Sequence, residues 1–218
     1  MSYERIANLT SIKRLPSYIR ALYHFRQAGR EVVSTTHLAE YLGVDAITVR
    51  KDLAITEIVG KPGSGYPVGE LLDALETFLG WHNETDAFLV GMGNLGRALC
   101  DYEGLKHHGL NIVGAFDIDP AKINPEARPV PVFPMERMSG LARRLHINIG
   151  ILAVPAAAAQ EATDVMVDAG LIAIWSFTPA EISVPEGIIV QREDIASSFA
   201  VLSRKLHRVL HSEGTDEK

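Results

Sequence analysis

Apolar residues recur along the first part of the chain with the period of about 3.6 residues that is typical of helices. Residues 11–29 read as one amphipathic helix, and residues 34–42 read as a second helix that Gly43 ends. A third helix is expected to begin after its N-cap Asp45, with Ile47 among its inward-facing side chains. Two short helices joined by a glycine turn predict a helix-turn-helix motif.

The polar positions of the third predicted helix carry side chains suited to DNA. They supply a hydroxyl, a guanidinium and an ammonium group, which bind base edges and phosphates in a major groove. The glycine-rich stretch GKPGSGYPV follows and predicts a hairpin wing, with Lys61 near its tip. The alternative is a small helical domain whose Arg50–Lys51 pair is merely solvated. The candidate DNA-binding residues are Thr48, Arg50, Lys51, Lys61, Ser64 and Tyr66.

Beyond the wing, the pattern changes to apolar runs that alternate with helical stretches. Residues 67–80 predict an amphipathic linker helix. Strands are expected in the stretches TDAFLV, LNIVGAFD, RPVPVFP, INIGILAVP, LIAIWSFTP and GIIVQ. Alternating strands and helices favour an α/β fold. The predicted architecture is a winged helix-turn-helix domain, then a Rossmann doubly wound parallel sheet, then a C-terminal helix.

The stretch FLVGMGNLGRAL joins the first of these strands to a helix through a GxGxxG loop. Gly91 makes the tight turn, Gly93 lets backbone approach a pyrophosphate, and Gly96 lets the helix pack on the strand. Asp117 ends the second strand, where a carboxylate binds ribose hydroxyls and repels a 2′-phosphate. Since no arginine follows it closely, the sequence favours NAD(H) over NADP(H). The alternative is that Asp117 only caps a turn before Pro120.

Ligands of a doubly wound sheet bind at the carboxyl ends of the strands. The fourth strand ends at Ala153 and the fifth near Ser176, so both ends are expected beside the nicotinamide. Besides the three glycines and Asp117, the candidate cofactor-binding residues are Met92, Asn94 and Leu95 in the loop, Tyr102 beyond the helix that follows it, Ile118 after the second strand, and Val154, Pro155, Phe177, Thr178 and Pro179 at the strand ends.

The last helical stretch, DIASSFAVLSRKLHRVLHS, carries an apolar seam that includes Ile195, Phe199 and Leu202. The seam packs either on its own domain or on another chain. A helix beyond the last strand is well placed for a dimer contact, and a protein that binds a palindromic site needs a dimer. The predicted domains are a winged-helix domain with its linker helix at 1–80, a Rossmann domain at 81–190, a dimerisation helix at 191–211 and a tail at 212–218.

Charge and composition agree with two domains. The net charge is −6, but residues 1–68 hold nine Lys and Arg against six Asp and Glu, whereas the remainder holds twelve against twenty-one. A basic N-terminal part and an acidic C-terminal part indicate different partners, and double-stranded DNA is the expected partner of the N-terminal part. No apolar run reaches the roughly 18 residues that span a bilayer. The N-terminus has no apolar signal core and Cys100 is the only cysteine, so we expect a cytoplasmic protein.

The sequence offers no convincing catalytic group. His107 and His108 are adjacent and His207 and His211 share a helix face, but no third ligand follows at a spacing that would hold a metal. Cys100 reads as a small buried thiol rather than a nucleophile. One dinucleotide fold fills the back domain and leaves little chain for a substrate domain, which indicates a sensor and not an enzyme. The alternative is a small NAD-dependent oxidoreductase or a CoA-binding Rossmann protein with a helical leader.

Together these motifs resemble the Rex family of redox-sensing transcriptional repressors over nearly the whole chain. The matching stretches are IKRLPSYIR, VRKDL, the GxGY of the wing, VGMGNLG followed by ALCDY, FDIDP, VPAAAAQ and the helix after EDIAS. The resemblance implies a homodimer that leaves a palindromic operator when NADH binds, while NAD+ competes. It also implies that the C-terminal helix is swapped against the partner subunit.

The resemblance further implies a switch made of three residues. Tyr102 would link the nucleotide state to the swapped helix, and Asp194 on that helix would contact Arg20 on the first helix in one state only. It assigns the pyrophosphate to the three loop glycines, the adenine ribose to Asp117 and the main DNA contacts to Arg50 and Lys51.

Four places depart from the family pattern. Residues 54–57 replace a serine followed by aromatics, and Pro62 and Ser64 stand in the wing where a basic and an apolar residue are usual. Ile195 replaces an aromatic near the nicotinamide, and Ser176 replaces an asparagine. The first two departures affect which operator sequence the protein recognises. The last two affect how strongly it discriminates between NADH and NAD+.

Overall fold

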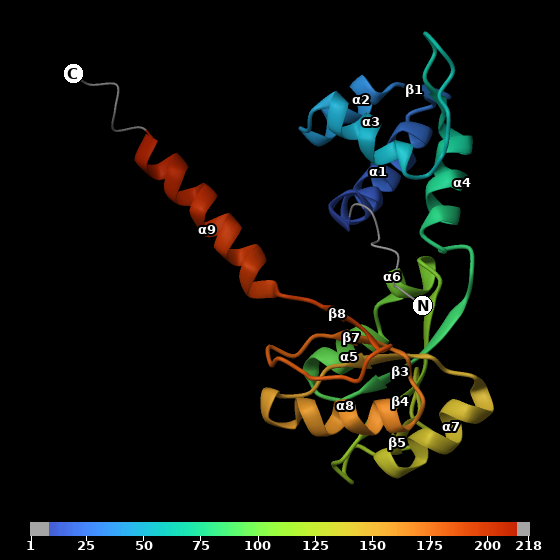
Figure 1. The fold of residues 1–218 in the computed structure, drawn as a ribbon, viewed down its shortest axis with the longest axis vertical. Coiled ribbons are helices and arrows are strands. Elements are labelled where there is room, and N and C mark those ends of the chain that lie inside the picture. Colours follow the sequence, from blue (N-terminus) through green and yellow to red (C-terminus); the bar gives the residue numbers. More distant parts are fainter. Residues whose placement is uncertain (1–8, 213–218) are drawn as a thin grey trace. The chain divides into compact units, whose positions relative to one another are not determined.

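The computed structural model describes residues 9–212 of the chain (Figure 1). These residues form two compact units, with the division between Glu84 and Thr85. The predicted tail at 212–218 lies, apart from Ser212, outside the described residues.

Unit 1, as far as it is described, contains four helices and a two-stranded antiparallel ribbon. The ends of α2 follow from local chemistry. Ser34 caps its start by accepting a hydrogen bond from the His37 backbone N–H at 3.1 Å, and Gly43 ends it with a φ of 65°. The elements are α1 (Leu9–Gln27), α2 (Thr35–Leu42), α3 (Ala46–Ala54) and α4 (Val68–Phe78), with β1 (Val32–Val33) paired to β2 (Tyr66–Pro67).

The core of unit 1 includes the helix that was expected to be a linker. Leu71, Leu72 and Leu75 of α4 are buried together with Leu15 and Leu22 of α1. The apolar stripe of α4 therefore packs in the core of unit 1, shortly before the division between the two units. The apolar side chains of α2 and α3 close the same core from the other side.

Unit 2 is built on a six-stranded sheet whose neighbouring strands are all parallel. The strand order is β5-β4-β3-β6-β7-β8, which is the order of a Rossmann fold. The strands are β3 (Thr85–Val90), β4 (Leu110–Asp117), β5 (Val132–Pro134), β6 (Ile149–Leu152), β7 (Ala173–Ser176) and β8 (Ile189–Arg192).

Helices cover both faces of this sheet because its central strands are apolar on both sides. Phe88 and Val90 of β3 pack in the core cluster under α7 and α8, whereas Ala87 and Leu89 pack in the cluster under α5 and α6. The sequence did not predict α6 or α7. The helices are α5 (Asn94–Cys100), α6 (Glu103–His107), α7 (Met138–Leu145) and α8 (Ala159–Asp168), with short 3-10 turns η1 (Met135–Arg137) and η2 (Ala156–Ala158).

The final helix, α9 (Ile195–Ser212), presents its apolar seam to solvent. Phe199 is 68% exposed, Leu202 is 62% and Val209 is 61%. An exposed apolar stripe on a long helix is the kind of surface that another chain covers. Across the residues that the structure describes, no helix combines the length and the hydropathy needed to cross a membrane.

Candidate functional site

The loop between β3 and α5 depends on glycine at two positions. Gly91 has a φ of 101°, in the left-handed region, and a Cβ on it would lie 2.6 Å from the carbonyl oxygen of Ala153. A Cβ on Gly96 would collide with the carbonyl oxygen of Gly91, so α5 packs directly against the end of β3. Gly93 caps α5 and faces open space. The loop thus offers bare backbone at a helix start, where phosphate binds in Rossmann folds.

A pocket with a volume of about 600 Å³ opens at the carboxyl ends of β3, β4 and β6. This volume lies within the range of small-molecule sites. Most of its exposed lining area is apolar, and its charged side chains are Asp117, Asp119, Lys122, Glu136 and Glu161. Six of the predicted cofactor residues meet here, namely Gly91, Gly93, Asp117, Ile118, Val154 and Pro155.

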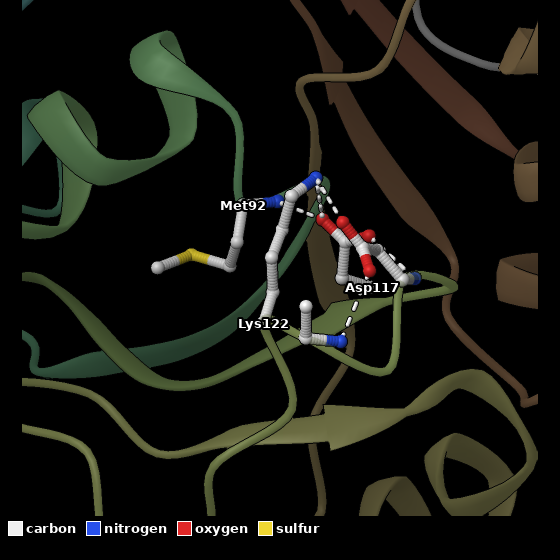
Figure 2. A network of polar contacts seen from close by, with 5 residues as sticks. Met92, Asp117 and Lys122 are labelled. Atoms are coloured by element: carbon white, nitrogen blue, oxygen red, sulfur yellow. Dashed lines mark hydrogen bonds and ion pairs between the residues drawn. The ribbon is translucent and has the colours of Figure 1, made fainter.

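Asp117 lines this pocket and binds the surrounding loops through both carboxylate oxygens (Figure 2). Its Oδ2 accepts hydrogen bonds from the Met92 backbone N–H at 2.7 Å and from Lys122 Nζ at 3.1 Å. Its Oδ1 accepts one from the Asp119 backbone N–H at 2.9 Å, which caps the turn before Pro120. Burial raises the pKa of the Asp117 carboxyl, but the hydrogen bonds outweigh burial and hold its pKa below the usual value.

Lys122 is the site residue that the sequence reasoning missed. The prediction of NAD(H) rested on the absence of an arginine shortly after Asp117. Lys122, five residues after Asp117, supplies a cation instead, and its Nζ also lies 3.9 Å from Asp119 Oδ2. It lines a second pocket of about 360 Å³ as well, together with Arg97 and Arg128. Because Lys122 compensates the charge of Asp117, repulsion of a 2′-phosphate by that carboxylate no longer suffices to argue for NAD(H) over NADP(H).

The other predicted cofactor residues lie outside the larger pocket. Asn94 and Leu95 are exposed on α5, and Met92 lines the smaller pocket. At the end of β7, the Phe177 ring packs against Trp175 with centroids 4.8 Å apart, and Thr178 is buried. Pro179 follows them and does not line the larger pocket either. Ser176 is fully buried, and its Oγ has no hydrogen-bond partner among the described residues.

In unit 1, α3 divides into a buried face and an exposed face. Val49 and Leu53 are fully buried, and Arg50 and Lys51 are exposed as predicted. The prediction for Ile47 was wrong. Its side chain is 60% exposed, because the helix begins at Ala46 and turns that position to the outside.

Thr48, in turn, is half-buried rather than facing outward. The position lies between the buried and the exposed face of α3, so its hydroxyl is less available to DNA than the guanidinium and ammonium groups that follow. The cations of α3 are therefore its main polar contribution to a DNA-binding surface.

A buried ion pair fixes α3 against α1. Arg14 Nε and Nη2 each donate to the Asp52 carboxylate at 2.6 Å, and the Tyr18 hydroxyl donates to Asp52 Oδ2 at 2.6 Å. The Asp52 side chain is 1% exposed and that of Arg14 is 33% exposed. Burial raises the pKa of the Asp52 carboxyl, but hydrogen bonds led by that of Arg14 outweigh burial and keep its pKa below the usual value.

The predicted wing is a tight hairpin turn. The backbone N–H groups of Lys61 and Gly65 donate to each other's carbonyl oxygens at 2.7 Å and 2.9 Å. Because this pairing closes the turn, Lys61 stands at its base and Ser64 near its tip, so the prediction of Lys61 near the tip was wrong. Both side chains are exposed. Tyr66 is instead half-buried and packs on the core of unit 1, with its ring under Gly60. Of the wing residues proposed to touch DNA, Tyr66 is thus the least accessible.

Comparison with known proteins agrees with both units. Residues 9–54 match the family model "Putative DNA-binding protein N-terminus", and residues 82–180 match the model "CoA binding domain". A redox-sensing transcriptional repressor Rex from Treponema denticola is 46% identical, over 93% of this chain and 96% of that protein. One from Bacteroides thetaiotaomicron is 39% identical over 90% of each. The chain belongs to the Rex family of redox-sensing transcriptional repressors.

Solved structures of a Rex-family protein have the same fold as this chain. A crystal structure of RSP, a Rex-family repressor, matches with a TM-score of 0.85 at 33% identity, and covers 96% of this chain and 99% of that one. RSP in complex with β-NAD+ and operator DNA matches with a TM-score of 0.86 at 32% identity, and covers 99% of this chain and 100% of that one. Rex-family proteins are transcriptional regulators, and the fold predicted from the sequence is confirmed.

Two of the three switch residues of the Rex pattern, Arg20 and Asp194, make local hydrogen bonds in this chain. Arg20 is exposed, and its Nη2 donates to Ser17 Oγ at 3.0 Å. Asp194 caps α9 by accepting hydrogen bonds from the Ser197 hydroxyl and, at 3.1 Å, from the Ser197 backbone N–H. Tyr102 is 59% exposed and stands at the start of α6. All three side chains are thus available to a further contact, and the side chain of Ile195 lies outside what is described.

Residues 55–57, one of the places where this chain departs from the Rex pattern, are held by local contacts. Ile55 follows α3 and packs on the core of unit 1, and Thr56 Oγ1 donates to the carbonyl oxygen of Leu53 at 2.7 Å. Glu57 has a φ of 60° and closes the turn that leads to the wing. The chain therefore replaces the usual aromatics by an aliphatic contact and a side-chain hydrogen bond.

The histidines and the cysteine have defined surroundings in the described residues. Among residues 9–212, no group of three or more His, Cys, Asp and Glu side chains could hold a metal ion. The rings of His207 and His211 stack 4.0 Å apart on α9. Burial raises the pKa of the Cys100 thiol to about 11, so it is protonated at neutral pH and a poor nucleophile.

Proposed function

We propose that this protein is a homodimeric repressor that binds NAD(H) in the 600 Å³ pocket and leaves a palindromic operator when NADH binds. The observation that supports this most directly is the pocket beside the glycine loop, in a chain whose other unit carries a helix-turn-helix with two exposed cations. A nucleotide site in the same chain as a DNA-binding unit is typical of a regulator that responds to a ligand. The complexes of RSP with β-NADH, and with β-NAD+ and operator DNA, support the same assignment.

The loop glycines and the start of α5 would hold the pyrophosphate, and Asp117 with Lys122 would face the adenine ribose. Val154 and Pro155, with the neighbouring end of β7, would surround the nicotinamide. The oxidised ring is a cation and the reduced ring is neutral. A mostly apolar pocket favours the neutral form, because a cation loses more hydration energy on entering it. This difference is the physical basis we propose for sensing the NADH/NAD+ ratio.

On the DNA side, Arg50 and Lys51 of α3 would enter the major groove, and Lys61 and Ser64 of the wing would contact the backbone. Residues 1–68 hold only three more Lys and Arg than Asp and Glu, so each subunit would make few phosphate contacts and two half-sites are needed. The exposed seam of α9 would pair with the partner subunit. There, Tyr102, Asp194 and Arg20 would form the contact that depends on the nucleotide.

The rival function is a small NAD-dependent oxidoreductase or a CoA-binding protein, which the match of residues 82–180 to a CoA-binding domain model also allows. A Rossmann fold alone does not choose among these activities. The helix-turn-helix unit and the repressor relatives favour regulation, and we propose that the protein has no catalytic activity. As a regulator of transcription it would act in the cytoplasm, on double-stranded DNA.

The nucleotide site is tested by Gly93→Val. A Cβ at this position meets nothing within 4 Å, so the variant should fold, while its side chain blocks the approach of a pyrophosphate. Titration followed by nicotinamide fluorescence should show NADH affinity roughly 5- to 160-fold weaker, since crowding a tight contact costs about 1–3 kcal/mol. Gly140→Val on α7, where a Cβ also meets nothing within 4 Å, is the matched control and should bind as wild type does. Equal affinity in both variants would contradict the proposed phosphate site.

A further inference from the structure

The exposed face of α3 combines two cations with an apolar side chain. Ile47, Arg50, Lys51 and Ala54 are all exposed, and their spacing of three, four and seven residues puts them on one face of the helix. Val49, Asp52 and Leu53 are buried on the opposite face. Ile47 therefore lies on the surface that carries the proposed DNA contacts.

Ile47 is exposed without any local reason. Its side chain is 60% exposed, although a branched aliphatic group gains nothing from water. Its backbone N–H is already used, because it donates to Asp45 Oδ1 at 2.6 Å in the N-cap of α3. All that this position offers a partner is the aliphatic side chain. It is also the second residue of the helix, and the N-terminal residues of a recognition helix are those that reach base edges.

We propose that Ile47 is a specificity-determining residue whose side chain contacts the 5-methyl group of a thymine in the major groove. The thymine methyl is the apolar group that base edges present in that groove, and it is the natural partner of an exposed aliphatic side chain there. Arg50 and Lys51, one turn further along the same face, supply the attraction to DNA that brings Ile47 against the bases. The inference rests on the proposed function, because it requires α3 to be the recognition helix.

The contact predicts a thymine preference at one position of each half-site. Binding would remove both the isoleucine side chain and the methyl group from water, and each buried methyl group contributes about 0.8 kcal/mol, or about fourfold in affinity. A palindromic operator presents the same contact twice, once to each subunit.

The test uses the full chain and a duplex that the wild-type protein selects from a random pool. Each thymine of that duplex is replaced in turn, in both half-sites, by 2′-deoxyuridine, which removes only the methyl group. Dissociation constants are measured by fluorescence anisotropy at one salt concentration for wild type and for Ile47→Ala. At one position, deoxyuridine should weaken wild-type binding by about fourfold per half-site and leave Ile47→Ala unaffected. Ile47→Val should retain part of the effect.

The matched control is Ile172→Ala, which removes an isoleucine that is 51% exposed in unit 2. This variant should show the full deoxyuridine effect. If no thymine position distinguishes wild type from Ile47→Ala, the inference is wrong while the proposed function stands. If the wild-type protein selects no duplex at all, the proposed function fails and the role of Ile47 fails with it.

Discussion

At the scale of single residues, the buried carboxylate of Asp52 connects the stability of unit 1 to its proposed DNA-binding face. Asp52 lies between two helices on the side of α3 opposite Arg50 and Lys51. Its three hydrogen bonds from Arg14 and Tyr18 fix the rotation of α3 about its own axis, which apolar packing of Val49 and Leu53 alone leaves less defined. The direction in which the cations point thus depends on a residue that touches no DNA.

This network predicts a pH-dependent loss of stability in Asp52→Asn. The pKa of Asp52 is lower in the folded chain than in the unfolded one, where it is about 3.9. The stability that the Asp52 carboxylate contributes is therefore complete above that value, and it is lost as the pH falls through the pKa of the folded chain. At pH 7 the variant should lose about 2 kcal/mol of the free energy of unfolding of unit 1, since Arg14 keeps some solvent. At pH 3 the difference in the free energy of unfolding between the variant and wild type should be smaller.

Urea denaturation at both pH values measures the difference. Asp73→Asn is the control, because the Asp73 side chain is 77% exposed on α4. It should match wild type at pH 7. Equal stability of Asp52→Asn and wild type at pH 7 would contradict the role given to this network.

Predictions for single residues succeeded where the spacing of residues requires one backbone geometry. They failed where a single side-chain contact or the start of a helix decides what a residue does. The GxGxxG spacing required the tight turn at Gly91 and the close packing at Gly96. By contrast, the cation beside Asp117 is Lys122, which reaches back across a turn that no periodicity reveals. Ile47 was expected inside because it is apolar, but its place on the helix puts it outside. An apolar residue of a helix is buried only where its position lies on the face that packs against the core.

At the scale of elements, the strands were predictable and the short helices were not. Continuous aliphatic runs that alternate with helical stretches require a parallel sheet with both faces covered, and the sheet has that form. The helices α6 and α7 are short, and their apolar positions are few enough to read as loop. The helix α4 was recognised as amphipathic, but its sequence gives no sign of which domain its apolar stripe faces.

The exposed seam of α9 makes a prediction about assembly. Phe199→Asp combined with Leu202→Asp should convert the dimer to a monomer, because two carboxylates cannot be buried without partners at an apolar contact. Analytical ultracentrifugation of the full chain measures the mass. The control is Ala200→Asp on the opposite side of α9, which should remain dimeric. A doubly substituted chain of unchanged dimer mass would place the dimer contact elsewhere.

At the scale of the whole molecule, the proposed DNA-binding unit and the proposed nucleotide-binding unit must influence each other. To switch from mostly bound to mostly free, NADH must favour the DNA-free state by a few kcal/mol. Linkage requires the reverse effect of equal size, so operator DNA must weaken the affinity for NADH by the same factor. The central claim is this coupling, since either site alone is compatible with the rival functions.

The most direct measurement is the anisotropy of a labelled operator duplex bound to the full chain, titrated with NADH and separately with NAD+ at one salt concentration. NADH should release the duplex at concentrations where NAD+ leaves it bound. Release by neither nucleotide, or by both at equal concentrations, would contradict the account of this protein as a sensor of the NADH/NAD+ ratio.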